Sequence, residues 1–460
     1  MMTEISCFTA SQVQTTPLHF IPTSQFPEWL TSQSAFTQQW LSAVGFTAAP
    51  ETYWLVPNEH GQIIAALAGV KSLDDPWMAA GFARSLPAGH YVMQNLSPKQ
   101  AFQACCAWGL GAYQFTRYKT EQKPTKAYLV WPGQVESREV LNFLRASYLV
   151  RDLINTPTED MGPAALAQAC IEAVAPHGAT TNVIVGDELL TQNYPAIHAV
   201  GRASTIPPRL IDIRWGNPTH RKLTLVGKGV CFDTGGLDIK SSGYMALMKK
   251  DMGGAAHALG LAMLIMQAKL PISLRVLIPA VENAISGNAY RPGDVIKTRK
   301  GLSVEITNTD AEGRLILADA LTEAVSEQPE LVLDLATLTG AARVALGTEV
   351  PVFFTPQTEL AKALETAGDL SQELIWRLPL YEGYRKMLDS PIADLNNSPS
   401  SSYGGAITAA LFLQQFVPES VAWAHFDLMA WNVSSKPGRP EGGEAMGLRA
   451  LWQMIQSRFV

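Results

Sequence analysis

Residues 222–240 read KLTLVGKGVCFDTGGLDIK, where a short apolar run leads directly into a glycine-rich stretch that carries Lys228, Asp233 and Lys240. The apolar run at residues 222–226 is typical of a strand buried inside a sheet. In open sheets of parallel strands, ligands bind beyond the carboxyl ends of the strands. The sequence therefore predicts that the charged residues of this stretch lie at a functional edge of a sheet.

The same pattern, a buried strand followed by a polar loop or a helix, recurs along the C-terminal two thirds of the chain. The sequence predicts further strands at residues 274–279, 303–307 and 331–335. It predicts helices at residues 253–268 and 313–327, and a third helix that begins at residue 340. Strands that alternate with helices of about 10–15 residues indicate an α/β fold with a mainly parallel sheet, covered by helices on both faces.

The first third of the chain differs, because it is rich in Gln, Thr, Ser, Pro and Trp and its hydrophobic periodicity is weak. Residues 136–152 are a predicted amphipathic helix, which Asn155-Thr156-Pro157 ends because the residue before a proline disfavours the α region. We therefore predict two domains, a smaller N-terminal α/β domain and a C-terminal α/β/α domain. The predicted bounds are 1–135 and 166–460, with a connecting helix and linker at 136–165.

The composition excludes several classes of protein. Hydrophobic residues make up 47% of the 460 and charged residues 17%, which is ordinary for a globular protein and too apolar for a disordered one. The longest apolar candidate, residues 255–266, contains His257 and falls short of the roughly 18–20 residues that span a membrane. The start has no basic region followed by an apolar one, so no secretory signal is predicted. A net charge of −6 argues against nucleic acid or an anionic membrane as a partner, and we expect a cytoplasmic protein.

Cysteine and histidine spacing argues against the common zinc motifs. The five cysteines form no CxxC pair, and the eight histidines form no HExxH motif, so a metal would need other ligands. Reduced, mostly buried thiols are expected in a chain of this length, and Cys231 is predicted to serve packing. His425 and Asp427 are predicted to form a buried hydrogen-bonded pair at the sheet edge, because no nucleophile accompanies them.

Three glycine-rich segments near the predicted strands contribute carboxylates. They are residues 226–240, 248–254 and 308–315, and they supply Asp233, Asp251, Asp310 and Glu312. Four carboxylates in a water-poor crevice repel one another unless cations neutralise them. Two divalent metal ions about 3.5–4 Å apart, bridged by carboxylates, meet this need.

Taken singly, each segment has a simpler interpretation. Gly227-Lys228-Gly229 fits a tight turn with a solvated lysine, and it lacks the spacing of a P-loop. Asp233-Thr234-Gly235 matches an aspartic-protease triplet, but no second DTG or DSG triplet supplies the partner aspartate. Asp310 could simply cap the helix that follows. Independent turns and caps would rarely place so many charges after successive buried strands, so the joint site is the better hypothesis.

The octapeptide NTDAEGRL at residues 308–315 resembles the signature of the leucyl aminopeptidase family, the M17 metallopeptidases. Further segments resemble the same family at residues 151–157, 227–236, 248–256, 291–294, 334–341 and 404–410. The resemblance extends from about residue 151 to about residue 427 and is faint in the first third. It implies that the C-terminal domain is a dimetal peptidase domain.

The resemblance implies a ligand set for two metal ions. Lys228, Asp233, Asp251 and Glu312 would hold the tighter ion, and Asp233, Asp310 and Glu312 the more exchangeable one. Zinc or manganese is the expected metal, with magnesium or cobalt as alternatives. A lysine must lose its proton to bind a metal, and a dicationic neighbour in a dry site lowers its pKa.

The resemblance also implies a mechanism. The metal pair would generate a bridging hydroxide near neutral pH and anchor the free α-amine of a peptide substrate. Lys240 would donate to the developing oxyanion. Arg314 would hold a bicarbonate ion, which acts as general base and passes the proton to the leaving amine. The expected activity is removal of the N-terminal residue from peptides by a dimetal aminopeptidase.

Substrate preference and assembly follow from the same resemblance. Met248, Thr337, Leu338 and Gly340 match positions that line an apolar pocket suited to leucine or methionine, although each also fits ordinary core packing. Many relatives carry a Gly-Ala-Thr-Gly-Arg-Pro type stretch near the end, where this chain has GEAMGLR at residues 443–449, and this departure affects the predicted pocket shape. The family generally forms hexamers, so a homohexamer is expected.

Two alternative functions remain open. A two-metal phosphatase or esterase could use the same acidic site, but it would need several cationic donors for phosphate, and only Lys240 and Arg314 are available. A catalytically altered or non-peptidase member of the family is the second alternative. Loss of a metal ligand would indicate it, and none is lost here.

Overall fold

The computed structural model describes residues 3–10, 14–121 and 126–460. The chain divides into two compact units. The first comprises residues 1–148 with 434–441, and the second comprises residues 149–433 with 442–460. Residues 1–2, at the start that was inspected for a signal, lie outside the described residues. None of the described helices is both long and apolar enough to cross a membrane.

The first unit is built on a six-stranded sheet with the order β1-β6-β5-β2-β4-β3. All neighbouring strands are parallel except β3 and β4. The strands are β1 (Phe8–Thr9), β2 (Thr15–Pro22), β3 (Tyr53–Pro57), β4 (Ile63–Val70), β5 (Gly89–Met93) and β6 (Ala127–Val130). The helices are α1 (Phe26–Thr31), α2 (Ala35–Ala43), α3 (Phe82–Ser85) and α4 (Pro98–Ala112).

Helix α4 shows how the sequence of the first unit specifies a helix start. Ser97 accepts a hydrogen bond from the backbone of Gln100, and the Gln100 side chain accepts one from the backbone of Ser97. This capping box satisfies two amide groups that the first turn leaves without partners. Pro98 follows at the first helical position, where its missing N–H costs nothing.

The second unit is built on a nine-stranded sheet. Eight of its strands lie in the order β16-β15-β18-β14-β9-β11-β8-β7, and the ninth, β10, pairs with β11 outside this order. The central strands β11, β9, β14 and β18 are mutually parallel, and β7, β8 and β15 run antiparallel to their inner neighbours. The strands are β7 (Thr180–Val185), β8 (Arg209–Gly216), β9 (Arg221–Gly227), β10 (Gly229–Asp233), β11 (Ile272–Asn283), β14 (Leu331–Ala336), β15 (Val352–Phe354), β16 (Trp376–Arg377) and β18 (Ala422–Asp427).

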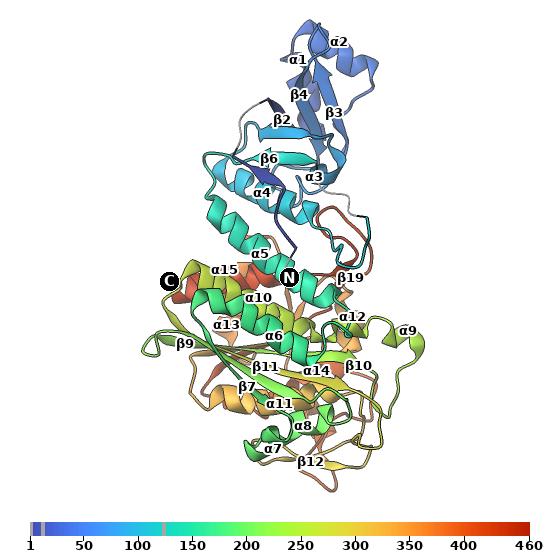
Figure 1. Ribbon diagram of the computed structural model, residues 1–460, viewed down its shortest axis with the longest axis vertical. Helices are drawn as coiled ribbons and strands as arrows, with labels where there is room; N and C mark the ends of the chain where they lie inside the picture. Colours follow the sequence, from blue (N-terminus) through green and yellow to red (C-terminus); the bar gives the residue numbers. More distant parts are fainter. Residues whose placement is uncertain (1–2, 11–13, 122–125) are drawn as a thin grey trace. The chain divides into compact units, whose positions relative to one another are not determined.

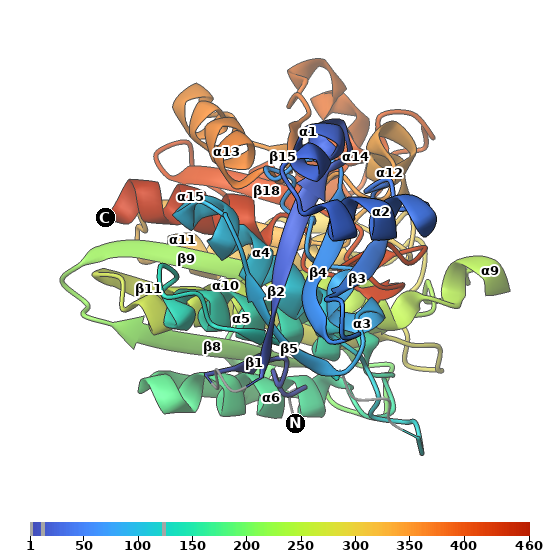
Figure 2. The same ribbon diagram turned by 90° about the horizontal axis from the view of Figure 1, so that it is seen from above.

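Helices cover both faces of this sheet (Figure 1). On one face lie α6 (Pro163–Val174) and α10 (Gly253–Ala268), and on the other α8 (Pro195–Gly201) and α11 (Glu312–Val325). Figure 2 shows α10 over the central strands from a second direction. The remaining helices are α5 (Ser137–Asn155), α7 (Glu188–Thr191), α9 (Ser242–Met245), α12 (Gly340–Leu346), α13 (Thr358–Ser371), α14 (Gly405–Gln414) and α15 (Leu448–Phe459).

Helix α10 lies in the core because its sequence, GGAAHALGLAMLIMQA, has no polar face. A helix that is apolar all round must be covered on all sides. Gly254 permits its close approach to the sheet, since a Cβ there would lie 2.0 Å from the carbonyl oxygen of Leu335 in β14. The start of α10 is therefore held directly against the carboxyl end of a central strand.

The predicted α/β fold with two domains and a mainly parallel sheet is confirmed. Helix α10 has the predicted bounds, and the predicted strand at residues 274–279 is the middle of the longer β11. The segment at residues 303–307 does not join the large sheet. It forms β13 (Ser303–Glu305) in a small sheet between β12 (Val295–Lys297) and β17 (Leu395–Asn396), and β19 (Trp431–Asn432) pairs with β20 (Gly442–Gly443).

Candidate metal centre

The carboxyl ends of β9 and β10 and the start of α11 bring the predicted metal ligands together. Lys228 lies between β9 and β10, Asp233 ends β10, and Glu312 is the first residue of α11, two residues after Asp310. Asp251 lies in η3 (Met248–Met252), the 3-10 helix that leads into α10. Four of the five are at most 3% exposed, and Asp310 is half-buried.

Lys228 joins two of the carboxylates. Its Nζ lies 2.8 Å from Asp251 Oδ2 and 2.9 Å from Glu312 Oε1, and it donates a hydrogen bond of 3.1 Å to the carbonyl oxygen of Thr337. Burial disfavours the ammonium form, but the charges of Asp251, Glu312 and Asp233 outweigh burial and raise the pKa of Lys228.

Lys240 contacts the other two carboxylates of the site. Its Nζ lies 2.9 Å from Asp233 Oδ2 and also contacts Asp310. One oxygen atom each of Asp233, Asp310 and Glu312 lie within 4.8 Å of one another. The site therefore gathers four carboxylates around two lysines, which leaves an excess of two negative charges when all six groups are ionised.

The electrostatics of the cluster indicate that it is incomplete without a cation. Burial and the charge of Asp233 raise the pKa of Glu312 to about 8, and the same two causes raise the pKa of Asp310 to about 6. Glu312 Oε2 is buried and has no hydrogen-bond partner among the described residues. A buried carboxylate oxygen without a partner is costly, and a metal ion would satisfy it.

The donor set fits divalent metal ions. Carboxylate oxygens bind all the candidate metals, and an amine nitrogen suits zinc and its transition-metal neighbours. Lys228 would have to give up its proton, and a dication among these carboxylates would remove the negative charge that keeps the proton in place. Lys228, Asp233, Asp251, Asp310 and Glu312 are thus placed where they could hold a metal pair.

Arg314 follows Glu312 in α11 and is 7% exposed. Its Nη1 donates a hydrogen bond of 2.7 Å to the carbonyl oxygen of Asn397, while its Nε has no partner among the described residues. Burial lowers the pKa of Arg314 to about 10, so the side chain still carries its charge near neutral pH. A buried guanidinium with an unused N–H can bind a small oxyanion.

Of the four predicted pocket residues, Thr337 contacts the metal centre, whereas Leu338 contacts Asp427 at the end of β18. Thr337 donates a hydrogen bond of 2.7 Å from Oγ1 to Asp251 Oδ1, and the backbone N–H of Leu338 donates one of 2.9 Å to Asp427 Oδ1. Gly340 is the first residue of α12, and Met248 is the first residue of η3. The loop after β14 therefore connects the metal centre to the predicted pocket.

The predicted hydrogen-bonded pair of His425 and Asp427 is wrong. His425 Nδ1 lies 2.5 Å from Asp334 Oδ1, whereas Asp427 accepts hydrogen bonds from the backbone of Leu338 and from Thr339. Alternate residues of a strand share a face, but neighbouring strand β14 and its loop offer better-placed partners. Strand β18 is also an inner strand rather than an edge.

The sequence interpretation missed several polar residues that surround the centre. Asn283 donates to Asp233 Oδ1 and to the carbonyl oxygen of Thr309, and Tyr290 donates to that same carbonyl oxygen. Asn283 ends β11, so the rule that drew attention to Asp233, a polar residue at the carboxyl end of a buried strand, could have found it.

Family models match both parts of the chain. Residues 148–452 match the catalytic domain of the cytosol aminopeptidase family, and residues 16–132 match the M17 aminopeptidase N-terminal domain. The chain belongs to the cytosol aminopeptidase family. The predicted family, and the class of metallo-exopeptidase that goes with it, are thereby confirmed.

Individual proteins agree with this assignment. A probable cytosol aminopeptidase of Syntrophotalea carbinolica is 44% identical over 312 residues, which are 67% of this chain and 62% of that relative. The crystal structure of the cytosol aminopeptidase from Coxiella burnetii is 48% identical with a TM-score of 0.96, and the match covers 99% of this chain and 100% of that one. The bottromycin maturation enzyme BotP, solved in complex with Mn, is 31% identical with a TM-score of 0.87, covering 97% and 100%.

Proposed function

We propose that this protein is a dimetal aminopeptidase that removes the N-terminal residue from peptides with a free N-terminus. The observation that carries the proposal is the buried cluster of four carboxylates and two lysines, in which Glu312 Oε2 has no hydrogen-bond partner among the described residues. Membership of the cytosol aminopeptidase family supports it. A phosphatase or esterase would need more cationic donors than Lys240 and Arg314.

In this proposal five side chains hold two divalent metal ions: Lys228, Asp233, Asp251, Asp310 and Glu312. When bound, such a pair makes water acidic enough to yield hydroxide near neutral pH and polarises the scissile carbonyl. The carboxylates fix the positions of the ions, because three of them bring oxygen atoms within 4.8 Å of one another. Manganese or zinc is the proposed metal, and the Mn complex of BotP supports manganese.

Lys240 is the proposed electrophile. The charges of Asp233 and Glu312 outweigh the effect of burial and raise its pKa, so that Lys240 keeps its proton at neutral pH. A protonated amine at this position would donate a hydrogen bond to the carbonyl oxygen of the substrate as that oxygen gains negative charge. Its present partners, Asp233 and Asp310, keep the side chain directed into the cluster.

Arg314 is the proposed site for a bicarbonate ion. One arm of the guanidinium is fixed by Asn397, and the unused Nε–H leaves a donor for an oxyanion. Bicarbonate held there would accept a proton from the attacking water and return it to the leaving amine. The charge of Arg314, retained in a buried position, would favour the anionic form of this ion.

The proposed pocket for the N-terminal side chain consists of Met248, Thr337, Leu338 and Gly340. Thr337 contacts the metal ligand Asp251, so the pocket begins beside the metal centre. A thioether and a leucine side chain suit an apolar substrate residue such as leucine or methionine. We further propose a homohexameric cytoplasmic enzyme, as the family resemblance implies.

Hydrolysis of a panel of aminoacyl-p-nitroanilides tests the function. The purified protein is treated with a chelator, and zinc, manganese or cobalt is then restored. We expect cleavage that requires both a metal and a free α-amine, with leucine or methionine preferred. Preferential hydrolysis of p-nitrophenyl phosphate would instead indicate the phosphatase or esterase. No cleavage by a folded protein with two bound ions would indicate a non-peptidase member of the family.

A further inference from the structure

Asn283 is a neutral residue buried in the wall of the metal centre. It is the last residue of β11 and is 1% exposed. Its Nδ2 donates one hydrogen bond of 2.8 Å to Asp233 Oδ1 and another of 3.0 Å to the carbonyl oxygen of Thr309. A single amide group therefore connects the end of β10 to the segment that carries Asp310.

The hydrogen bonds to Asp233 fix which of its oxygens faces the cluster. Oδ1 accepts from Asn283 and also from the backbone N–H of Gly235 at 2.8 Å. Oδ2 lies 2.9 Å from Lys240 Nζ and is the oxygen directed at the neighbouring charges. Two N–H donors on one oxygen hold the carboxylate plane, so Asp233 cannot rotate without losing both.

The second hydrogen bond from Asn283 fixes the backbone of Thr309, the residue before Asp310. The carbonyl oxygen of Thr309 accepts from Asn283 and, at 2.6 Å, from the hydroxyl of Tyr290. The Thr309 side chain donates to the carbonyl oxygen of Gly235 at 2.6 Å. The peptide unit directly before Asp310 is thus held by three contacts that involve no metal ion.

Only one orientation of the Asn283 amide satisfies these contacts. Asp233 Oδ1 and the Thr309 carbonyl oxygen are acceptors, so the NH₂ group must face both. The Asn283 Oδ1 atom lies close to Gly236, where a Cβ would be 3.0 Å from it. Asn283 Oδ1 has no hydrogen-bond partner among the described residues, so the two N–H donations alone determine the orientation of this side chain.

We propose that Asn283 is a positioning residue that sets the distance and orientation between Asp233 and Asp310 for metal binding. The inference rests on the proposed function, because it takes these two aspartates as metal ligands. Side chains that hydrogen-bond to metal ligands hold those ligands in the orientation that binding needs, and their loss typically lowers metal affinity by about 10–100-fold. Asn283 acts through Asp233 and Thr309 and does not itself touch the metals or the substrate.

Metal titration of the metal-free protein tests this role without relying on activity. Asn283→Leu replaces the amide with an apolar group of similar size, and we expect the dissociation constant of the weaker-binding Mn²⁺ to rise about 10–100-fold. Asn396→Leu is the matched control. Asn396 is also buried and donates to two backbone carbonyl oxygens, those of Met387 and Asp389, but to no metal-site residue. The control should bind both ions with the affinity of the unchanged protein.

A second readout separates positioning from general destabilisation. Excess Mn²⁺ should restore most of the turnover lost in Asn283→Leu, because the substrate contacts are intact. Asn283→Ser, which is smaller but whose hydroxyl cannot reach both acceptors, serves the same test if the leucine variant does not fold. Wild-type affinity for both ions in a folded Asn283 variant would overturn the inference. A wild-type protein that binds two ions but cleaves no aminoacyl substrate would overturn the proposed function alone.

Discussion

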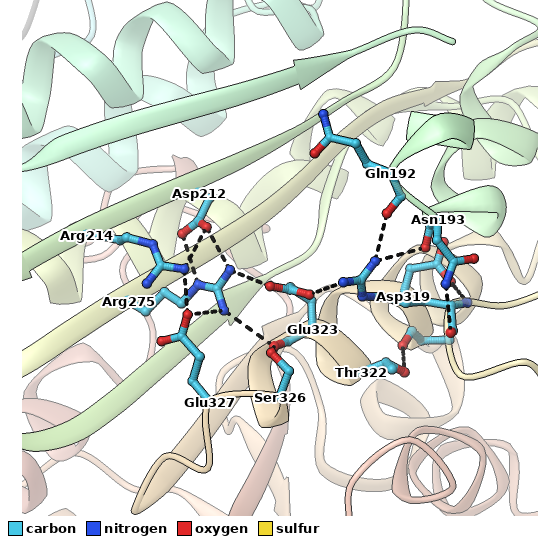
Figure 3. A network of polar contacts seen from close by, with 12 residues as sticks. Gln192, Asn193, Asp212, Arg214, Arg275, Asp319, Thr322, Glu323, Ser326 and Glu327 are labelled. Atoms are coloured by element: carbon cyan, nitrogen blue, oxygen red, sulfur yellow. Dashed lines mark hydrogen bonds and ion pairs between the residues drawn. The ribbon is translucent and has the colours of Figure 1, made fainter. Parts of the chain in front are cut away.

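Helix α11 contributes to two clusters of charge that are built in opposite ways. Glu312 at its first residue belongs to the metal centre, and Glu323 near its last turn belongs to an ion-pair network on β8 and β11 (Figure 3). We call the second cluster the Arg275 network. It consists of Asp212, Arg214, Arg275, Arg299, Glu323 and Glu327.

The Arg275 network is balanced. Three arginines face three carboxylates, and Arg275 alone lies 2.7 Å from Asp212, 2.6 Å from Glu323 and 3.2 Å from Glu327. Its position also suits the helix dipole, because cations near the carboxyl end of a helix are stabilising. None of the side-chain oxygens of these three carboxylates is a buried atom without a partner in the described part of the chain.

The metal centre is unbalanced by comparison. Its carboxylates outnumber its lysines, and Glu312 Oε2 lacks a hydrogen-bond partner in the part of the chain that the structure describes. A satisfied cluster stabilises a fold, whereas an unsatisfied one of the same residue types stores a cost that a ligand removes. In this chain the excess of buried carboxylates over lysines distinguishes the metal centre from the balanced Arg275 network.

Neutralising Glu312 should have the largest effect. It should abolish activity without lowering the stability of the metal-free protein. Glu312→Gln removes a bridging charge, and we expect activity to fall by roughly 10⁴-fold or more, with loss of bound metal. The metal-free variant should unfold at the same temperature as the metal-free parent or a higher one, since one repulsive charge is gone. Metal analysis and thermal unfolding of both metal-free proteins measure this. A fully active variant with two bound ions would contradict the ligand assignment.

Breaking the Arg275 network should give the reverse result. Arg275→Met leaves Asp212 and Glu323 buried without their main partner, and we expect the free energy of unfolding to fall by about 3–5 kcal/mol. Metal content and kcat of the folded fraction should stay unchanged. Denaturant unfolding monitors stability, and the double variant with Asp212→Asn should recover part of the loss. An Arg275→Met variant of unchanged stability would remove the contrast between the two clusters.

Substitution of Lys240 tests whether this residue of the metal centre stabilises the transition state. Lys240→Ala should keep both metals and lose about 10²–10³-fold in kcat, the usual effect of removing an oxyanion donor. Lys222→Ala is the control, because the Lys222 side chain donates to the backbone carbonyl oxygen of Glu327 and, among the described residues, to no member of the metal centre. Steady-state kinetics separates the two roles. If KM rises and kcat does not change, Lys240 binds substrate and contributes little to the transition state.

Each residue that the sequence proposes as a metal ligand lies beside a strong local signal. Asp233 and Asp310 are charged residues in glycine-rich loops next to buried strands, and α10 has an apolar run that only a core helix tolerates. Such signals depend on residues close together in the chain. They place the charged ends of several elements at one edge of the sheet without any knowledge of the full topology.

The features that the sequence did not reveal depend on contacts between distant segments. The strand at residues 303–305 joins a separate sheet because its partner β17 lies about ninety residues further along the chain. Asp212 and Arg275 look like ordinary surface charges in the sequence, and only the pairing of β8 with β11 brings them together. Asn283 has no charge to draw attention to it, although Asp233, to which it donates a hydrogen bond, has one.

The pKa values of the two buried histidines of the second unit are shifted in opposite directions by their surroundings. His257 Nδ1 donates to the carbonyl oxygen of Gly253 at 2.6 Å, and its Nε2 accepts from the backbone of Met446 at 2.9 Å. The contact with Met446 needs the neutral ring, because a protonated Nε2 cannot accept, and burial lowers the pKa of His257 to about 4. His425 is buried beside Asp334, whose charge outweighs burial and raises its pKa.

The two histidines should therefore affect stability against pH with opposite signs. Between about pH 6.5 and pH 4 the unfolded chain binds a proton at His257 that the folded protein does not, so stability falls as pH falls, by up to about 3 kcal/mol. His425 has the raised pKa, and its contribution is present at low pH and lost as pH rises through that value. Urea unfolding of His257→Gln between pH 4.5 and 6.5 should show a flatter acid limb than the parent. His425→Gln should leave the slope of that limb unchanged and should instead remove the loss of stability that the parent shows above about pH 6.5. A parent-like slope of His257→Gln below pH 6.5, or of His425→Gln above it, would mean that the ring concerned does not titrate as its surroundings require.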